Sequence, residues 1–135
     1  MTRFFILILI CLCLYNCKSE DKSEKNNTAV AKTELSKDSK IFLGNRLFSE
    51  KTCITCHAID RKDTGPSVKE IVAIYTKEDA SIIDFLKGKA KPKVDTNPIQ
   101  VAMMKANING FLKNVTDVEL DAIVTYMYHV DELNK

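Results

Sequence analysis

The segment CITCH, residues 53–57, places two cysteines three positions apart and a histidine directly after the second one. At this spacing the thiols of Cys53 and Cys56 lie on one turn of chain, and the imidazole of His57 projects onto the same side. Thiols in such an arrangement serve three kinds of site: a redox disulfide, a zinc site, or the covalent attachment of haem. Each of these sites would strongly restrict the fold around it.

The rest of the sequence favours haem attachment over the other two sites. A thioredoxin-like disulfide centre follows a strand in an α/β fold, and no strand is predicted before Cys53. A zinc site needs further ligands, but the second histidine, His129, lies far away near the C-terminus and has no companion cysteine. We therefore predict one haem c, held by thioether bonds to Cys53 and Cys56, with His57 as the proximal iron ligand.

The N-terminal sequence predicts export from the cytoplasm. Arg3 precedes an apolar run at residues 4–14, which is too short to span a bilayer and is typical of a signal peptide. The apolar sequence then gives way at Cys17 to KSEDKSEKNN, as in a bacterial lipoprotein signal, whose cysteine is lipidated and becomes the new N-terminus. Asn16 departs from the small residue usual before that cysteine, so a plain signal peptide or an uncleaved anchor remains an alternative.

Cysteine usage supports this division of the chain. Of the five cysteines, Cys11 and Cys13 lie in the apolar run and Cys17 occupies the predicted lipid site. Only the two cysteines of CITCH remain for a folded domain, so the sequence excludes a disulfide framework and a four-cysteine metal site.

Composition predicts three segments: a lipoprotein-type signal peptide at residues 1–16, a lipidated cysteine with a flexible linker at 17–40, and a folded domain at 41–135. The linker has few large apolar side chains, so burial cannot offset the entropy lost on ordering it.

The net charge is +2, from 20 basic and 18 acidic residues. Charge therefore gives no argument for nucleic-acid binding.

Hydrophobic periodicity within the domain predicts helices and no strands, and hence an all-α fold. Thr116 and Glu119 are spaced as a capping box that would start the last helix. Pro92 and Pro98 predict a loop between the third helix and the methionine-containing segment. The expected helices are at 39–51, around 68–75, around 78–87 before Gly88, and after Thr116, where Leu120, Ile123, Val124 and Met127 form an apolar face.

Four segments occur in the order found in class I cytochromes c: GNRLF, CITCH, TGPS and ELDAIVTYM. From about residue 41 to 130 the chain resembles that family. The resemblance implies the cytochrome c fold, with four to five helices around one covalently bound haem. In this fold the first and last helices cross at a glycine and an aromatic residue, so Gly44 and Phe48 are expected to meet Ile123 and Tyr126.

The same resemblance implies the remaining haem contacts. The backbone carbonyl of Pro66 is expected to accept a hydrogen bond from the far ring nitrogen of His57 and so to fix its tautomer. The sixth iron ligand is expected from the loop before the last helix, where VAMMKANI offers Met104 as first choice and Met103 as second choice. Met104 is preferred because MKAN resembles the MKxN of related bacterial cytochromes. His129 is expected at the surface.

The resemblance also implies a function, that of an electron-transfer protein and not an enzyme. We expect a one-electron carrier in the bacterial cell envelope, tethered to a membrane through its lipid anchor. A quinol-oxidising complex or a dehydrogenase would be its donor, and a terminal oxidase or reductase its acceptor. The alternatives are a haem-based gas sensor with an open iron site, and a redox subunit held in a larger complex.

Four alternating lysines precede the methionine segment: Lys87, Lys89, Lys91 and Lys93. They predict either a basic collar that steers an acidic partner toward the haem edge or a solvated loop that keeps the domain soluble.

Overall fold

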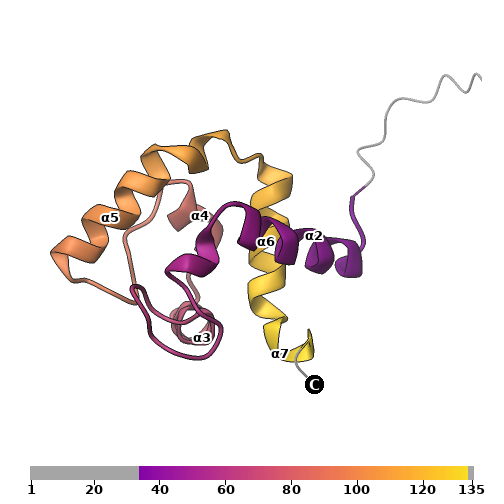
Figure 1. Ribbon diagram of the computed structural model, residues 1–135, viewed down its shortest axis with the longest axis horizontal. Helices are drawn as coiled ribbons and strands as arrows, with labels where there is room; N and C mark the ends of the chain where they lie inside the picture. Colours follow the sequence, from indigo (N-terminus) through magenta and orange to yellow (C-terminus); the bar gives the residue numbers. More distant parts are fainter. Residues whose placement is uncertain (1–33, 134–135) are drawn as a thin grey trace, which may run out of the picture. The chain divides into compact units, whose positions relative to one another are not determined.

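The computed structural model describes residues 34–133, which form a helical domain (Figure 1). This part of the chain contains six α-helices, two 3-10 helices and no strand, so the all-α prediction is confirmed with slightly more helices than expected. The predicted signal peptide at 1–16, Cys17 and most of the predicted linker lie outside the described residues. The elements are α2 (Lys37–Glu50), η2 (Cys53–Thr55), α3 (Val68–Lys77), α4 (Ile82–Leu86), α5 (Pro98–Asn109), η3 (Phe111–Asn114), α6 (Asp117–Tyr128) and α7 (Val130–Leu133).

Helix α6 begins at the predicted capping box. The Glu119 amide donates to Thr116 Oγ1 at 3.3 Å, and the Thr116 amide donates to Glu119 Oε2 at 2.8 Å. These bonds satisfy two amides that would otherwise lack partners at the helix start. The hydrogen bond from the Thr116 amide also lowers the pKa of the Glu119 carboxyl, because it favours the ionised form.

Helices α2 and α6 cross at their backbones, as Figure 1 shows. A Cβ atom on Gly44 would overlap the carbonyl oxygen of Ala122 and lie 2.7 Å from the Cβ atom of Tyr126. The rings of Phe48 and Tyr126 pack beside this point, with centroids 5.5 Å apart and planes tilted by 56°. Gly44 therefore meets Ala122, the residue before the expected Ile123, and the expected aromatic contact is present.

The core is built mainly on α6, whose predicted apolar face is buried. Six of its residues are buried: Leu120, Ala122, Ile123, Val124, Tyr126 and Met127. Helix α5, by contrast, has no buried residue, and Figure 1 shows it on the opposite side of the domain from the start of α2. Helix α5 therefore lies at the margin of the core, against which Met104 and Ile108 pack while partly exposed.

In residues 34–133 no helix has the length and apolar character needed to cross a bilayer.

Candidate functional site

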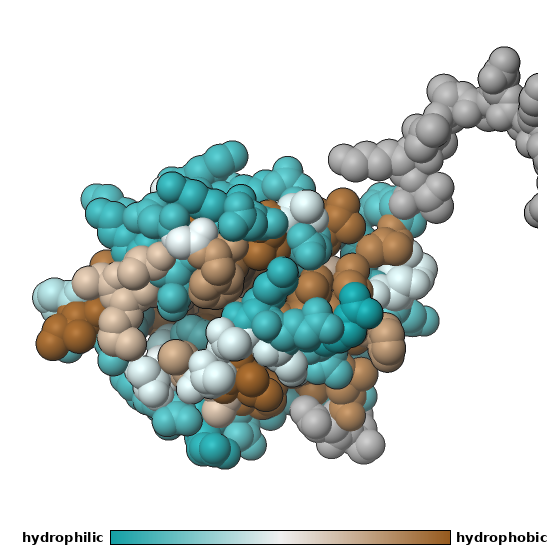
Figure 2. All heavy atoms as spheres, turned by 45° about the horizontal axis from the view of Figure 1, so that its top comes forward, coloured by the Kyte–Doolittle hydropathy of each residue, from teal (hydrophilic) through white to brown (hydrophobic). Residues whose placement is uncertain are grey.

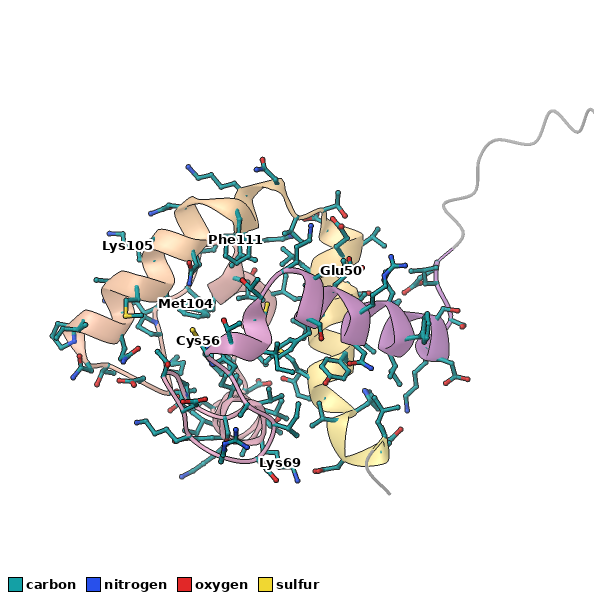
Figure 3. All side chains as sticks on the ribbon, in the orientation of Figure 1. Glu50, Cys56, Lys69, Met104, Lys105 and Phe111 are labelled. Atoms are coloured by element: carbon teal, nitrogen blue, oxygen red, sulfur yellow. The ribbon has the colours of Figure 1, made fainter. Side chains whose placement is uncertain are left out.

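A cavity of about 640 Å³ lies between the CITCH segment and helix α5. Cys53, Cys56 and His57 contribute to one wall, and Met103 and Met104 contribute to the wall formed by α5. Figure 3 shows Met104 on the side of α5 that faces Cys56. Most of the exposed surface inside this cavity is apolar, and its volume lies within the range of about 300–1,000 Å³ common for cofactor pockets.

The chain turns sharply between α2 and the CITCH segment. Thr52 adopts a left-handed conformation with φ of 59°, which is unusual for a β-branched residue. Its carbonyl oxygen accepts a hydrogen bond from Thr55 Oγ1 at 2.6 Å, and the His57 amide donates to the Cys53 carbonyl at 3.0 Å. This turn brings both cysteines and the histidine to the same cavity.

The two thiols differ in their surroundings. Cys53 is half-buried and packs against the hydrophobic core, whereas Cys56 lies 3.8 Å, sulfur to oxygen, from the Thr55 hydroxyl. Burial raises the pKa of the Cys53 thiol, because removal from water disfavours the thiolate. Both cysteines are free thiols, as attachment of a group at these positions requires.

The loop after CITCH holds the ring of His57. The Nδ1 atom of His57 lies 2.8 Å from the carbonyl oxygen of Pro66, so the hydrogen bond expected between them is present. Because a carbonyl can only accept, Nδ1 carries the proton and Nε2 is left with its lone pair for a metal. The sequence prediction named Pro66 for this site and missed its neighbour Gly65.

Gly65 is packed directly against the imidazole. A Cβ atom on this residue would lie 2.7 Å from His57 Cε1 and 2.9 Å from His57 Nδ1. The Gly65 amide also donates to the Cys56 carbonyl at 2.9 Å. The glycine of TGPS was the available signal, since a close approach of backbone to a ring leaves no room for a side chain.

The methionines lie on a helix, so the prediction that they belong to a loop was wrong. The Asn97 side chain accepts a hydrogen bond from the Ile99 amide at 2.9 Å, and Pro98 occupies the first turn of α5. A proline there has no amide to lose from the helical hydrogen bonds, so it starts this helix. Met103 is 45% exposed, while Met104 is partly buried against the core.

Outside the cavity, His129 is the remaining candidate ligand. His129 is half-buried at the end of α6, where its Nδ1 atom lies 2.7 Å from the Thr125 carbonyl oxygen, and it does not line the cavity. Among residues 34–133, no three His, Cys, Asp or Glu side chains are arranged to hold a metal ion.

Two of the four alternating lysines form ion pairs. Lys87 Nζ lies 2.7 Å from an oxygen of Asp117, and Lys93 Nζ lies 2.9 Å from an oxygen of Glu78. Lys89 and Lys91 form no ion pair within the described residues. Figure 2 shows hydrophilic residues over much of one face of the domain, with apolar residues exposed between them.

The donor atoms around the cavity fit haem. Cys53 and Cys56 can form two thioethers, His57 offers a neutral nitrogen whose tautomer is fixed, and a thioether sulfur stands in the wall formed by α5. A large and mostly apolar cavity suits the flat porphyrin. The residues that would hold the group are therefore Cys53, Cys56, His57 and one of the two methionines.

Comparison with known proteins agrees with this chemistry. The family model described as cytochrome c matches residues 41–131. Cytochrome c-551 of Azotobacter vinelandii is 43% identical over 60 residues, which cover 44% of this chain and 72% of that protein. The matched family region contains both the CITCH segment and α5.

Proposed function

The chain belongs to the cytochrome c family, and from that premise we propose that it is a membrane-tethered one-electron carrier. Proteins of this family transfer electrons and hold haem c covalently, and Cys53, Cys56 and His57 supply the attachment motif. The observation that carries the electron-carrier part of this proposal is the cavity, which has this motif on one wall and two methionines on another.

Bound at this site, the haem supplies the one-electron chemistry of an iron that alternates between its ferrous and ferric states. His57 would bind the iron through Nε2, while Pro66 holds the proton on Nδ1. This hydrogen bond orients the ring and makes it a stronger donor to iron. Gly65 packs against the imidazole ring, and because it has no side chain it allows this close contact.

Met104 is the proposed sixth ligand. It is the more buried methionine and faces Cys56 across the cavity in Figure 3, whereas Met103 is 45% exposed. A thioether is soft and neutral, so it favours ferrous iron and raises the reduction potential. If His57 and Met104 both bound the iron, no iron site would be open to substrate, which would favour electron transfer over gas sensing.

The tether is proposed from the sequence. Export through the signal peptide at 1–16 would bring the chain to the periplasmic side of the membrane. The similarity to a bacterial cytochrome c-551 supports this location. Lipidation of Cys17 would then anchor it. The linker predicted at residues 17–40 would be shorter than expected, because helix α2 of the domain already begins at Lys37. A linker of this length has a root-mean-square reach of roughly 25 Å if it behaves as a flexible coil.

Docking is proposed at the mouth of the cavity, where partner proteins would approach the haem edge. Lys89 and Lys91 have no ion pair in the described domain and could steer an acidic partner at low salt. Lys87 and Lys93 are already engaged with carboxylates, so only half of the predicted collar remains for this role. The proposed donor is a quinol-oxidising complex or a dehydrogenase, and the proposed acceptor is a terminal oxidase or reductase.

Two matched variants of the haem-loaded protein test the ligand set. Met104→Ala should abolish the weak long-wavelength band of methionine-bound ferric haem and lower the midpoint potential, because the iron loses a ligand that favours its ferrous state. Met103→Ala should leave both unchanged. The opposite pattern would assign Met103, and absence of the band from the unaltered protein would favour the gas sensor.

A further inference from the structure

Helix α5 is held only weakly by its own side chains. It buries no residue, and Met104 and Ile108 pack partly buried against the core. Its C-terminal end is followed closely by Leu112, which is 6% exposed and anchors that end in the core. Pro98 and Ile99 at the other end are exposed, and Figure 1 shows the start of α5 at the edge of the domain. The position of the first half of α5 therefore depends on the segment that leads into it.

That segment, residues 88–97, connects α4 to α5, and we call it the strap. Its first end is fixed in two ways. Lys87 Nζ, just before the strap, lies 2.7 Å from an oxygen of Asp117 at the start of α6. A Cβ atom on Gly88 would lie 3.3 Å from Ile108 Cγ2, so the strap begins against the second half of α5. Other contacts must fix the far end of the strap, nearer Pro98.

Lys93 joins this far end to α3. Its Nζ atom lies 2.9 Å from a carboxylate oxygen of Glu78, which directly follows α3. Tyr75 of α3 lies on the same side, since burial raises its pKa to about 12 and a hydrogen bond with the Lys93 backbone lowers it. Val94, next to Lys93, packs partly buried against the core. The strap is therefore fixed to α3 shortly before α5 begins.

A second ionic contact of the strap is longer. Asp95 has an oxygen 3.9 Å from Lys62 Nζ, and Asp95 Oδ1 also accepts a hydrogen bond from the Asn97 amide at 2.9 Å. At that separation a surface pair contributes little. Of the two ion pairs that the strap forms, the one between Glu78 and Lys93 is the shorter and joins it to a helix.

We propose that the Glu78–Lys93 ion pair is a latch that holds the strap, and with it the first half of α5, against the haem site. The proposal rests on the proposed function, because it requires a haem whose iron is bound by a methionine of α5. Glu78 and Lys93 are then positioning residues for that methionine. Their side chains are 42% and 41% exposed, so water weakens the pair and it can break and reform readily.

The latch limits how often the sixth iron site opens. When the pair separates, the strap and the start of α5 can move while Leu112 keeps the other end in place. A small neutral ligand from solution can then replace the methionine thioether, an exchange of donors in which no electron is transferred. At high ligand concentration the exchange rate reaches a limit set by opening, so this limit measures how often the latch is open.

The test uses the full haem-loaded chain in its ferric form, with imidazole as the ligand at a pH where imidazole is neutral. Glu78→Gln and Lys93→Gln each remove one charge of the latch and should raise the limiting rate about two- to fivefold, the strength of an exposed ion pair. Hydrogen exchange of the backbone amides in α5 should accelerate by a similar factor. The double variant Glu78→Lys, Lys93→Glu reforms the pair at the same net charge and should return both rates to those of the unaltered protein.

Lys69→Gln is the matched control. It breaks an ion pair of the same helix α3, between Lys69 Nζ and an oxygen of Asp131 at 2.6 Å, which leads to α7 and not to the strap. It should leave both rates unchanged. Rates in either latch variant equal to those of Lys69→Gln would overturn the proposal, as would a double variant as fast as the single ones. Unaltered protein that lacks haem or the methionine band would contradict the proposed function itself, and the latch with it.

Discussion

At the residue scale, the site depends on contacts too close to admit a single extra carbon. The His57 Nδ1 atom lies 2.8 Å from the Pro66 carbonyl oxygen, and a Cβ atom on Gly65 would lie 2.9 Å from the same nitrogen, so the ring is oriented by backbone atoms and not by mobile side chains. CITCH and TGPS together were enough to predict the histidine and its carbonyl partner. The role of Gly65 could not be predicted, because the approach of its Cα atom to the ring depends on the path of the loop.

Gly65→Ala tests this contact. The added Cβ would push against His57 Cε1 and Nδ1, and the ring could move only by stretching its hydrogen bond to Pro66. Overpacking of this kind typically costs about 1–3 kcal/mol of unfolding free energy. Denaturant titration of the haem-loaded variant measures the loss, and unchanged stability would show that the loop adapts without strain.

At the element scale, the crossing of α2 and α6 holds the site in place. Helix α2 leads directly into the CITCH segment, while α6 contributes Ile123 and Met127 to the cavity wall. Gly44 permits the close approach of these two helices. Periodicity and the capping box were sufficient to predict both helices.

Gly44→Ala should be strongly destabilising. The new Cβ would collide with the backbone of Ala122, which cannot rotate away as a side chain could. We expect a loss of about 3 kcal/mol of unfolding free energy, at the upper end of typical overpacking costs, or failure to accumulate folded protein. Asn45→Ala, at the next and exposed position of α2, is the control and should be neutral or slightly stabilising. Equal stability of the two variants would contradict the close crossing.

Helix α5 shows where sequence reasoning failed at this scale. Pro98 was interpreted as part of a loop, yet together with the Asn97 cap it begins a helix that reaches Asn109. Helix α5 buries no residue, so it lacks the strong amphipathic pattern that identified α6. Its position beside the cavity follows from the fold and could not be read from local sequence.

Thr116→Ala tests the start of α6. Loss of this cap should lower the unfolding free energy by about 1 kcal/mol at neutral pH. Because the folded-state pKa of Glu119 is lowered, its contribution is present above the unfolded-state pKa and is lost as the pH falls through the folded-state value. The difference in unfolding free energy between the variant and the unaltered protein should therefore become smaller at acidic pH. Chemical denaturation as a function of pH measures it, and a difference that stays constant in acid would contradict the coupling.

At the scale of the whole molecule, the proposal joins a haem domain to a membrane through a linker. Sequence patterns alone predict the signal peptide, Cys17 and the linker. Ion pairs hold the start of the folded domain. Lys40 Nζ lies 2.7 Å from an oxygen of Glu34 and 2.9 Å from an oxygen of Asp121 in α6. These pairs fix the residues before α2 to the domain, so the linker would start from a defined place.

Cys17→Ser tests the anchor in a bacterium that processes lipoproteins. The unaltered protein should sediment with membranes and carry lipid by mass spectrometry, whereas the variant should be recovered without lipid. Cys13→Ser changes a cysteine within the predicted signal peptide and should keep both properties. Membrane sedimentation of Cys17→Ser would indicate an uncleaved anchor or a protein partner.

The most direct test of the account is the intact mass and the reduced-minus-oxidised spectrum of the protein exported by a bacterium that attaches haem c. We predict the added mass of one haem, retained after denaturation, together with the spectrum of a c-type cytochrome. The Cys53→Ala, Cys56→Ala double variant should retain no covalent haem. Colourless unaltered protein with no added mass, or full covalent attachment in the double variant, would contradict the central claim.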